Sequence, residues 1–326
     1  MQEKIKIGLV GTGHMGQYHV NVAAGLSNVY DVVGIFDISQ ERREEIGERF
    51  GVKPYGDLDA LFGDSDAVAI AVPTALHYET ALKALNMGKH VLVEKPMTET
   101  VEQARELVEL AAKKNLIFQV GHVERFNGAV LELKKIVDRP FLIETRRLAP
   151  FNPRISDVGV VLDLMIHDLD IVINLVGEKV TSVHSRGCRA FSDHEDIAVA
   201  TLQFENGTIA NLNASRATQS KVRTLTISQE KAYILLDFAT QDIDIHRQAS
   251  SAYLMTREEL KYRQESFVEK IAIHKDNPLR QEHMHFVECI RGTTAPIVKN
   301  ESDLMTLEIA QEILQQIKHS MDGAKV

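Results

Sequence analysis

Short runs of apolar residues alternate with longer amphipathic stretches along the first third of the chain. The apolar runs predict β-strands at residues 5–10, 32–36, 67–72, 90–93 and 117–120. The stretches between them, including residues 75–87 and 101–114, carry apolar side chains at helical spacing, and Gly88 follows as a helix stop. Strands joined by helices in this way are typical of parallel βαβ units, so residues 1–121 are predicted to form a doubly wound α/β domain.

The pattern changes after residue 121. Helical spacing at residues 123–137 and 158–176 is followed by runs that predict strands at residues 181–186, 197–204, 208–215, 223–228 and 232–238. Asn206 and Gly207 predict a hairpin between two of these strands, since Asn-Gly readily adopts positive φ. Two more helices are predicted at residues 281–290 and 302–317. Residues 122–326 are therefore predicted to form an α+β domain whose mostly antiparallel sheet carries helices on one face.

Length and composition exclude several classes of protein. A chain of 326 residues is long enough for two domains, and a net charge of −9 argues against a general nucleic-acid-binding role. No apolar run approaches the roughly 20 residues that span a bilayer, and no secretion signal precedes the first strand, so no membrane association is expected. Cys188 and Cys289 lack the spacing of a metal site or a disulfide framework, which favours a cytoplasmic protein without a metal.

A glycine-rich segment joins the first predicted strand to the helix that follows. Gly11, Gly13 and Gly16 have the G-x-G-x-x-G spacing of dinucleotide-binding Rossmann domains. The first glycine permits a tight turn, the second lets the backbone approach a pyrophosphate, and the third lets helix and strand pack closely. The candidate cofactor residues of this segment are Gly11, Thr12, Gly13, His14, Met15 and Gly16.

An acidic residue follows the second predicted strand. The carboxylate of Asp37 stands where it can accept a hydrogen bond from a ribose 2′-hydroxyl and repel a 2′-phosphate, which favours NAD over NADP. Arg42 and Arg43 lie in the next helix, where a solvent-exposed position is expected.

Further candidates lie where two predicted strands end. Glu94, Lys95 and Pro96 follow one strand, and ligands bind at the carboxyl edge of an open α/β sheet. Because a residue before proline is held extended, the Lys95 ammonium is expected to project toward the cofactor crevice, although spacing alone also fits a solvent-exposed lysine. Pro73, Thr74 and His77 follow the neighbouring strand, and His77 either caps the helix, lines the site or is exposed.

The predicted helix at residues 158–176 is largely apolar and carries a polar stripe. Asp163, His167, Asp170 and Asn174 share one face at 100° per residue. Burial of two carboxylates and an imidazole costs several kcal/mol unless they are paired or serve a site. The stripe therefore faces either an active site or a satisfied polar network.

Together these motifs resemble the glucose–fructose oxidoreductase and inositol dehydrogenase (Gfo/Idh/MocA) family over essentially the whole chain. The resemblance also includes the segment that begins at Asn277, Pro278 and Leu279 and runs to Phe286. It implies a Rossmann domain that binds NAD, followed by a domain whose open sheet often pairs with another subunit, giving a homodimer or homotetramer. It also implies oxidation or reduction of a secondary hydroxyl on a sugar, a cyclitol or a nucleotide-sugar.

The resemblance assigns catalysis to Lys95, Asp163 and His167. Histidine suits a general base at neutral pH, and a lysine ammonium stabilises a developing alkoxide. Asp163 would orient the imidazole or bind a neighbouring hydroxyl. Whether Lys95 or His167 takes the proton stays open.

One segment is less generic within the family. Residues 119–127 are similar to members that act on UDP-sugars, notably the UDP-N-acetylglucosamine 3-dehydrogenases that supply amino sugars for lipid A. The substrate contacts implied are Arg125, Asn127, Asp170 and Arg216, although a surface or interface position suits Arg216 equally well. An inositol or free-sugar dehydrogenase, a lyase or glycosidase that uses NAD transiently, and a non-enzymatic NAD-binding regulator are the alternatives.

Overall fold

The computed structural model describes residues 3–153, 158–248, 266–297 and 299–323. The chain forms two compact units. The first unit comprises residues 1–126 and 276–308, and the second unit comprises residues 127–275 and 309–326. The structure differs from a single division at residue 121 in two respects, because the first unit extends to residue 126 and residues 276–308 return to it.

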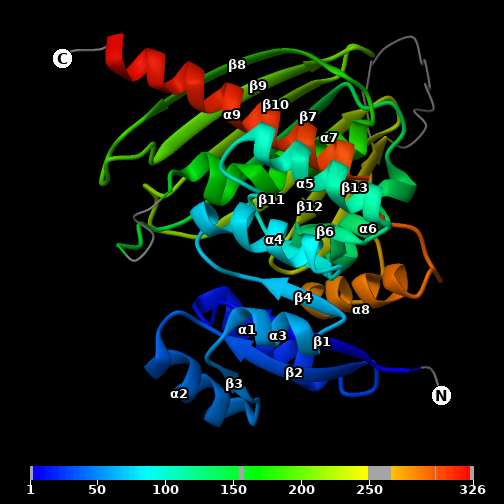
Figure 1. Ribbon diagram of the computed structural model, residues 1–326. Coiled ribbons are helices and arrows are strands. Elements are labelled where there is room, and N and C mark those ends of the chain that lie inside the picture. The colour runs from blue at the N-terminus through cyan, green and yellow to red at the C-terminus, as the bar shows by residue number, and fades with distance from the viewer. Residues whose placement is uncertain (1–2, 154–157, 249–265, 298, 324–326) are drawn as a thin grey trace, which may run out of the picture. The chain divides into compact units, whose positions relative to one another are not determined.

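The first unit contains a six-stranded sheet with the order β3-β2-β1-β4-β5-β6, and its strands are parallel (Figure 1). The strands are β1 (Ile5–Val10), β2 (Tyr30–Phe36), β3 (Pro54–Tyr55), β4 (Ala67–Ile70), β5 (His90–Glu94) and β6 (Phe118–Gly121). The predicted doubly wound sheet is confirmed. Strand β3 was not predicted, because two residues carry no periodicity.

Helices cover both faces of this sheet. They are α1 (His14–Gly25), α2 (Gln40–Phe50), α3 (Leu58–Asp64), η1 (Thr74–Leu76), α4 (His77–Asn86), α5 (Val101–Lys114), η2 (Val123–Phe126), α8 (Pro278–Ile290) and the first part of α9 (Asn300–Gly323). On one face Leu9 packs in a cluster with Val20 of α1 and Phe286 of α8. On the other face Val93 packs in a cluster with Leu107 of α5. The strands are apolar throughout because both faces are buried.

The second unit contains an eight-stranded sheet with the order β14-β13-β12-β11-β7-β10-β9-β8. Its strands are β7 (Leu142–Leu148), β8 (Val180–Cys188), β9 (Ile197–Phe204), β10 (Ile209–Ser215), β11 (Val222–Gln229), β12 (Ala232–Asp237), β13 (Asp242–Gln248) and β14 (Ser266–Lys270). Strands β7 and β10 pair in parallel, and the other described pairs are antiparallel. The predicted mostly antiparallel sheet is confirmed, including the β9–β10 hairpin, where Gly207 has a φ of 87°.

One face of the second sheet is covered by helices. Strand β9 buries Ala198, Ala200 and Leu202 and leaves Val199 exposed on the opposite face. Helix α7 (Ile166–Val176) contacts β7 and β10, and α6 (Gly128–Ile136) contacts β13. The alternation along β9 therefore reflects one covered and one open face.

Two predicted helices are interrupted in the structure. The helix predicted at residues 123–137 divides into η2 and α6, because Asn127 caps α6 by accepting a hydrogen bond from the amide of Ala129 at 3.1 Å. The helix predicted at residues 158–176 begins with a π-helical turn, η3 (Val161–Met165), before α7. The regular 100° spacing assumed for the polar stripe therefore does not hold at Asp163.

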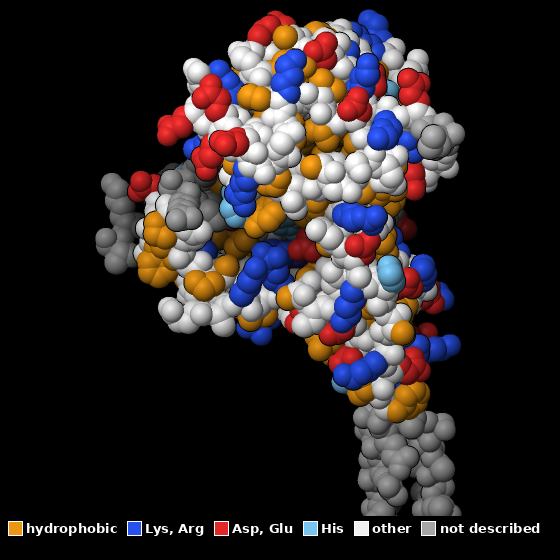
Figure 2. Space-filling model, turned by 90° about the horizontal axis from the view of Figure 1, so that it is seen from below, with side chains coloured by type: hydrophobic (Ala, Val, Ile, Leu, Met, Phe, Trp, Pro, Cys, Tyr) orange, Lys and Arg blue, Asp and Glu red, His pale blue; other side chains and the backbone are white. Residues whose placement is uncertain are grey.

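Charged side chains of both signs share the surface. On the face shown in Figure 2, acidic and basic side chains of the described residues are interspersed. Among the described residues, no helix is both long and apolar enough to cross a bilayer.

Candidate active site

The glycine loop has the backbone geometry that a dinucleotide requires. Gly11 has a φ of 90°, and a Cβ there would collide with the carbonyl oxygen of Ala71. A Cβ on Gly16 would collide with the carbonyl oxygen of Gly11, so α1 starts against the loop. At Gly13, by contrast, no described atom lies within 4 Å of the Cβ position, and no side chain of the described residues caps α1. The amides at the start of α1 can therefore bind a pyrophosphate, and the loop fits NAD.

Asp37 closes the same loop from the end of β2. One carboxylate oxygen accepts hydrogen bonds from the amide and the hydroxyl of Thr12, both at 2.8 Å, and the other accepts one from the amide of Ser39 at 2.9 Å. Burial raises the pKa of Asp37, but these hydrogen bonds outweigh it and hold the pKa below its ordinary value. The carboxylate is ionised and retains acceptor capacity for a ribose hydroxyl.

His77 braces the carboxyl edge of the first sheet. It is buried, with Nδ1 2.8 Å from the carbonyl oxygen of Pro96 and Nε2 2.9 Å from that of Val72. Burial lowers its pKa although both carbonyls act in the opposite direction. His77 therefore links the loop after β4, which holds Pro73 and Thr74, to the loop after β5, and this bracing was not among the roles considered from sequence.

Lys95 follows β5 and is half-buried. Its peptide bond to Pro96 is cis, a feature that the sequence did not predict. Its backbone amide donates a hydrogen bond to Glu94 at 3.2 Å. Glu94 is itself buried, so it belongs to the interior of the first unit, behind the carboxyl edge of the sheet where the cofactor is expected.

The polar stripe of the second unit divides between half-buried and buried residues. Asp163 lies on η3 and His167 on the first turn of α7, and both are half-buried. Asp170 is buried, and the amide of Asn174 donates to its carboxylate at 3.0 Å. π-Helical turns occur frequently at functional sites, and the catalytic role of Asp163 and His167 stays a prediction.

Two acids that the stripe does not include hold this helix in place. Asp168 is buried and accepts a hydrogen bond from Arg147 of β7 at 2.7 Å. Glu195 accepts a hydrogen bond from the amide of Val161 at 3.1 Å, and a Cβ on Gly159 would collide with its carboxylate. Sequence spacing could not reveal Glu195, because it precedes a different element and meets the helix start only in the fold.

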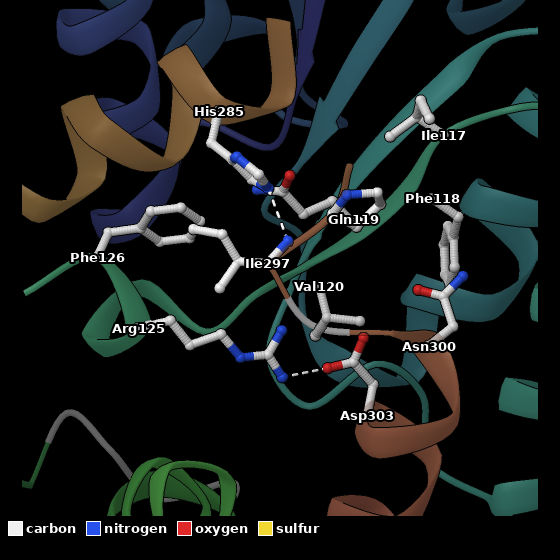
Figure 3. Close-up of a pocket in the computed structure, with 11 residues that line it drawn as sticks. Ile117, Phe118, Gln119, Val120, Arg125, Phe126, His285, Ile297, Asn300 and Asp303 are labelled. Atoms are coloured by element: carbon white, nitrogen blue, oxygen red, sulfur yellow. Dashed lines mark hydrogen bonds and ion pairs between the residues drawn. The ribbon is translucent and has the colours of Figure 1, made fainter. Parts of the chain in front are cut away.

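Arg125 and Asn127 have structural partners. Arg125 forms a buried ion pair with Asp303 beside a cavity of about 20 Å³, which has room for a single water (Figure 3). In the second unit, the amide of Asn127 donates to the carbonyl oxygen of Phe238 at 3.1 Å while its oxygen caps α6. Their proposed contacts with substrate stay predictions.

Arg216 is an internal clamp of the second unit. It is 4% exposed, and its guanidinium donates to Asp196 at 2.6 Å, to the hydroxyl of Ser192 at 2.8 Å and to the carbonyl oxygen of Val158 at 3.0 Å. Burial raises the pKa of Asp196, but backbone amides and Arg216 lower it further than burial raises it. The guanidinium thus ties the loop before β9 to the start of the polar-stripe helix, and a phosphate contact stays a prediction.

Comparisons with known proteins agree with both units. The family model described as "Oxidoreductase family, NAD-binding Rossmann fold" matches residues 5–122, and the "GFO/IDH/MocA C-terminal domain" model matches residues 127–235. The chain is 33% identical to UDP-N-acetylglucosamine 3-dehydrogenase of Acidithiobacillus ferrooxidans over 83% of its own length and 90% of the relative's. A solved structure of that enzyme has a TM-score of 0.88 at 29% identity and covers 98% of this chain and 99% of its own. The scyllo-inositol 2-dehydrogenase (NAD(+)) of Bacillus subtilis is 25% identical over 98% of this chain and 96% of its own.

Proposed function

We propose that this chain, which belongs to the GFO/IDH/MocA family of NAD-binding oxidoreductases, oxidises the 3-hydroxyl of UDP-N-acetylglucosamine. The observation that carries the proposal is the 33% identity to a UDP-N-acetylglucosamine 3-dehydrogenase over nine-tenths of that enzyme. The residues that the family resemblance assigns to catalysis, Lys95, Asp163 and His167, are all present.

The first unit supplies the cofactor site. The backbone at Gly13 and the first amides of α1 would hold the pyrophosphate. The carboxylate of Asp37 would accept a hydrogen bond from a ribose hydroxyl. The bound nicotinamide supplies a hydride acceptor for the carbinol carbon. The ionised Asp37 disfavours a 2′-phosphate, which supports NAD as the cofactor.

Three side chains would handle the hydroxyl group. His167 would remove its proton, and the Lys95 ammonium would donate a hydrogen bond to the oxygen as negative charge develops. Asp163 precedes His167 by one turn and would hold the imidazole or a neighbouring hydroxyl. Glu195 supports these roles indirectly, since it binds the amide of Val161 at the start of the same helix.

A substrate panel tests the proposal. The protein is incubated with NAD and, in turn, UDP-N-acetylglucosamine, UDP-glucose, N-acetylglucosamine, myo-inositol and scyllo-inositol, and NADH absorbance is followed. Turnover is expected with UDP-N-acetylglucosamine, and His167→Ala should abolish most of it while leaving NADH binding unchanged. Turnover of an inositol without any UDP-sugar would replace the proposal by the inositol dehydrogenase alternative. NADH binding without turnover of any substrate would favour the alternative of a non-enzymatic NAD-binding regulator.

The open face of the second sheet supports a homo-oligomer. Val199, Ile209 and Tyr233 are apolar and 44%, 42% and 44% exposed there. We propose that a second copy of the chain covers this face in a homodimer or homotetramer. Light scattering should give a mass of at least two chains for the wild type and one chain for Val199→Glu combined with Tyr233→Glu. A monomeric wild type would contradict the proposal.

The two cysteines support a reducing compartment. Cys188 and Cys289 are free thiols, and burial raises the pKa of Cys289 to about 11, which makes it unreactive. We therefore propose that the reaction takes place in the cytoplasm.

A further inference from the structure

A continuous line of buried side chains crosses the first unit. The hydroxyl of Tyr30 lies 3.2 Å from Nδ1 of His283, Nε2 of His283 lies 2.9 Å from Nδ1 of His19, and Nε2 of His19 lies 2.9 Å from Glu94. The exposed fractions are 2% for Tyr30 and His19, 0% for His283 and 7% for Glu94. Four elements, β2, α8, α1 and β5, therefore meet through buried polar side chains.

The charge of Glu94 fixes the donor at one end of this line. Burial raises the pKa of Glu94, but the hydrogen bond from His19 and the charge of Lys95 hold it below its ordinary value, so the carboxylate is ionised and only accepts. Nε2 of His19 must therefore donate to Glu94. Burial lowers the pKa of His283 well below its ordinary value, so that ring is neutral. At the other end, the hydroxyl of Tyr30 lies 3.2 Å from both Nδ1 and the carbonyl oxygen of His283 and donates to one of them.

The carboxylate end of the line reaches Lys95. One oxygen of Glu94 faces His19, and the other accepts the backbone amide of Lys95 at 3.2 Å. Gly121 on β6 leaves room for this arrangement, because a Cβ there would lie 3.2 Å from the Cα of Glu94 and 3.3 Å from its Cδ. The carboxylate of Glu94 thus has the ring of His19 on one side and the backbone amide of Lys95 on the other.

We propose that His19 and His283 are positioning residues that hold Lys95 through Glu94. This proposal rests on the function proposed above for Lys95. In this proposal neither histidine contacts NAD or substrate. His19 lies on α1, whose first turn would bind the pyrophosphate, so the line fixes the distance between the phosphate-binding loop and Lys95. His283 lies on α8, which packs beside α1 (Figure 1), and this gives the returning segment a role in catalysis.

Two substitutions at position 19 test the proposal. His19→Leu removes the donor to Glu94 and should lower kcat roughly ten- to a hundredfold, since small misplacements of a reacting group have effects of this size, with KM for NAD little changed. His19→Gln places an amide donor close to the position of Nε2 and should restore most of kcat. Val20→Ala is the matched control, because Val20 is 0% exposed on the same helix and its side chain cannot form a hydrogen bond with the line. It should destabilise the protein without lowering kcat.

A second measurement does not depend on turnover. Hydrogen exchange of the peptide that contains the Lys95 amide, measured without substrate, should be faster in His19→Leu than in the wild type, His19→Gln or Val20→Ala. Equal exchange and equal kcat in His19→Leu and wild type would overturn the proposal, and so would the same acceleration in Val20→Ala. If the wild type turns over no sugar while exchange rises only in His19→Leu, the positioning of Lys95 stands and the proposed function fails.

Discussion

The most direct test of the first unit's interior is the substitution Glu282→Gln. Glu282 lies on α8 with 0% exposure, and neither of its carboxylate oxygens forms a hydrogen bond within the residues that the structure describes. Burial raises its pKa well above the ordinary value, and the charge of Glu94 adds to this, while Arg125 acts in the opposite direction. Glu282 is therefore protonated in the folded protein at a pH where it is ionised in the unfolded chain.

The sign of the effect on stability follows from proton binding. Below the ordinary glutamic acid pKa both states bind the proton, and Glu282 causes no pH dependence. Above it the unfolded state releases the proton first, so the wild type loses stability by up to about 1.4 kcal/mol for each pH unit until the folded-state pKa is reached. The Gln variant has no proton to release and avoids this loss. For each kcal/mol of stability that the wild type loses as the pH rises, the Tm of Glu282→Gln should gain about 2–4 °C relative to the wild type.

Thermal melts by circular dichroism between about pH 5 and about pH 8 measure this. The control is Glu109→Gln, since Glu109 is exposed on α5, and no gain like that of Glu282→Gln is expected from it. A Tm advantage of Glu282→Gln that is constant over this range would refute the reasoning. An equal gain in Glu109→Gln would refute it as well.

Three further substitutions probe the cofactor loop and the polar-stripe helix. Gly13→Ala should fold normally but bind NADH at least about tenfold more weakly, because the added methyl group enters open space that the pyrophosphate needs. NADH fluorescence measures the binding. The control is Gly25→Ala at the other end of α1, which also faces open space and should leave NADH binding normal. Asp37→Ser should raise the kcat/KM ratio for NADP over NAD by on the order of tenfold, because the repulsive charge is lost, and an unchanged ratio would remove Asp37 from cofactor choice. Gly159→Ala should displace Glu195 and cost about 1–2 kcal/mol of unfolding free energy in urea titrations, as loss of a helix cap does; a stability equal to wild type would show that Glu195 is not needed there.

The elements that sequence predicted best are those buried on two faces or marked by local turn chemistry. The strands of the first sheet are apolar throughout, so each one except β3 was predicted to within two residues of its bounds. Strand β7 was missed because its open face carries Glu144 and Arg146 and its covered face carries Arg147, which removes the apolar alternation. The parallel pairing of β7 with β10 could not be predicted, since β7 itself was not.

In the candidate site, too, sequence predicts the residues that lie close together along the chain and misses partners that meet only in the fold. The glycine spacing and Asp37 lie within one βαβ unit, so local sequence predicts them, and the structure places the Asp37 carboxylate against the glycine loop through Thr12. His19 and His283 are 264 positions apart, and no spacing rule joins them. Arg216 was a candidate for a phosphate contact because arginine suits phosphate, but the sequence does not show that Asp196 is its partner in the fold.

The return of residues 276–308 to the first unit affects how the chain can mature during synthesis. Phe286 and Val287 of α8 belong to the same core cluster as Leu9 and Val20, and Leu307 belongs to the cluster on the other face of the sheet. A ribosome-bound chain ending at residue 126 therefore contains every strand of the first sheet but lacks part of its core on both faces. Although amino-terminal domains generally fold first during translation, this one is completed only after residues 127–275 of the second unit have been synthesised. The glycine loop is thus among the first parts of the chain to be synthesised and among the last to be packed against a complete core.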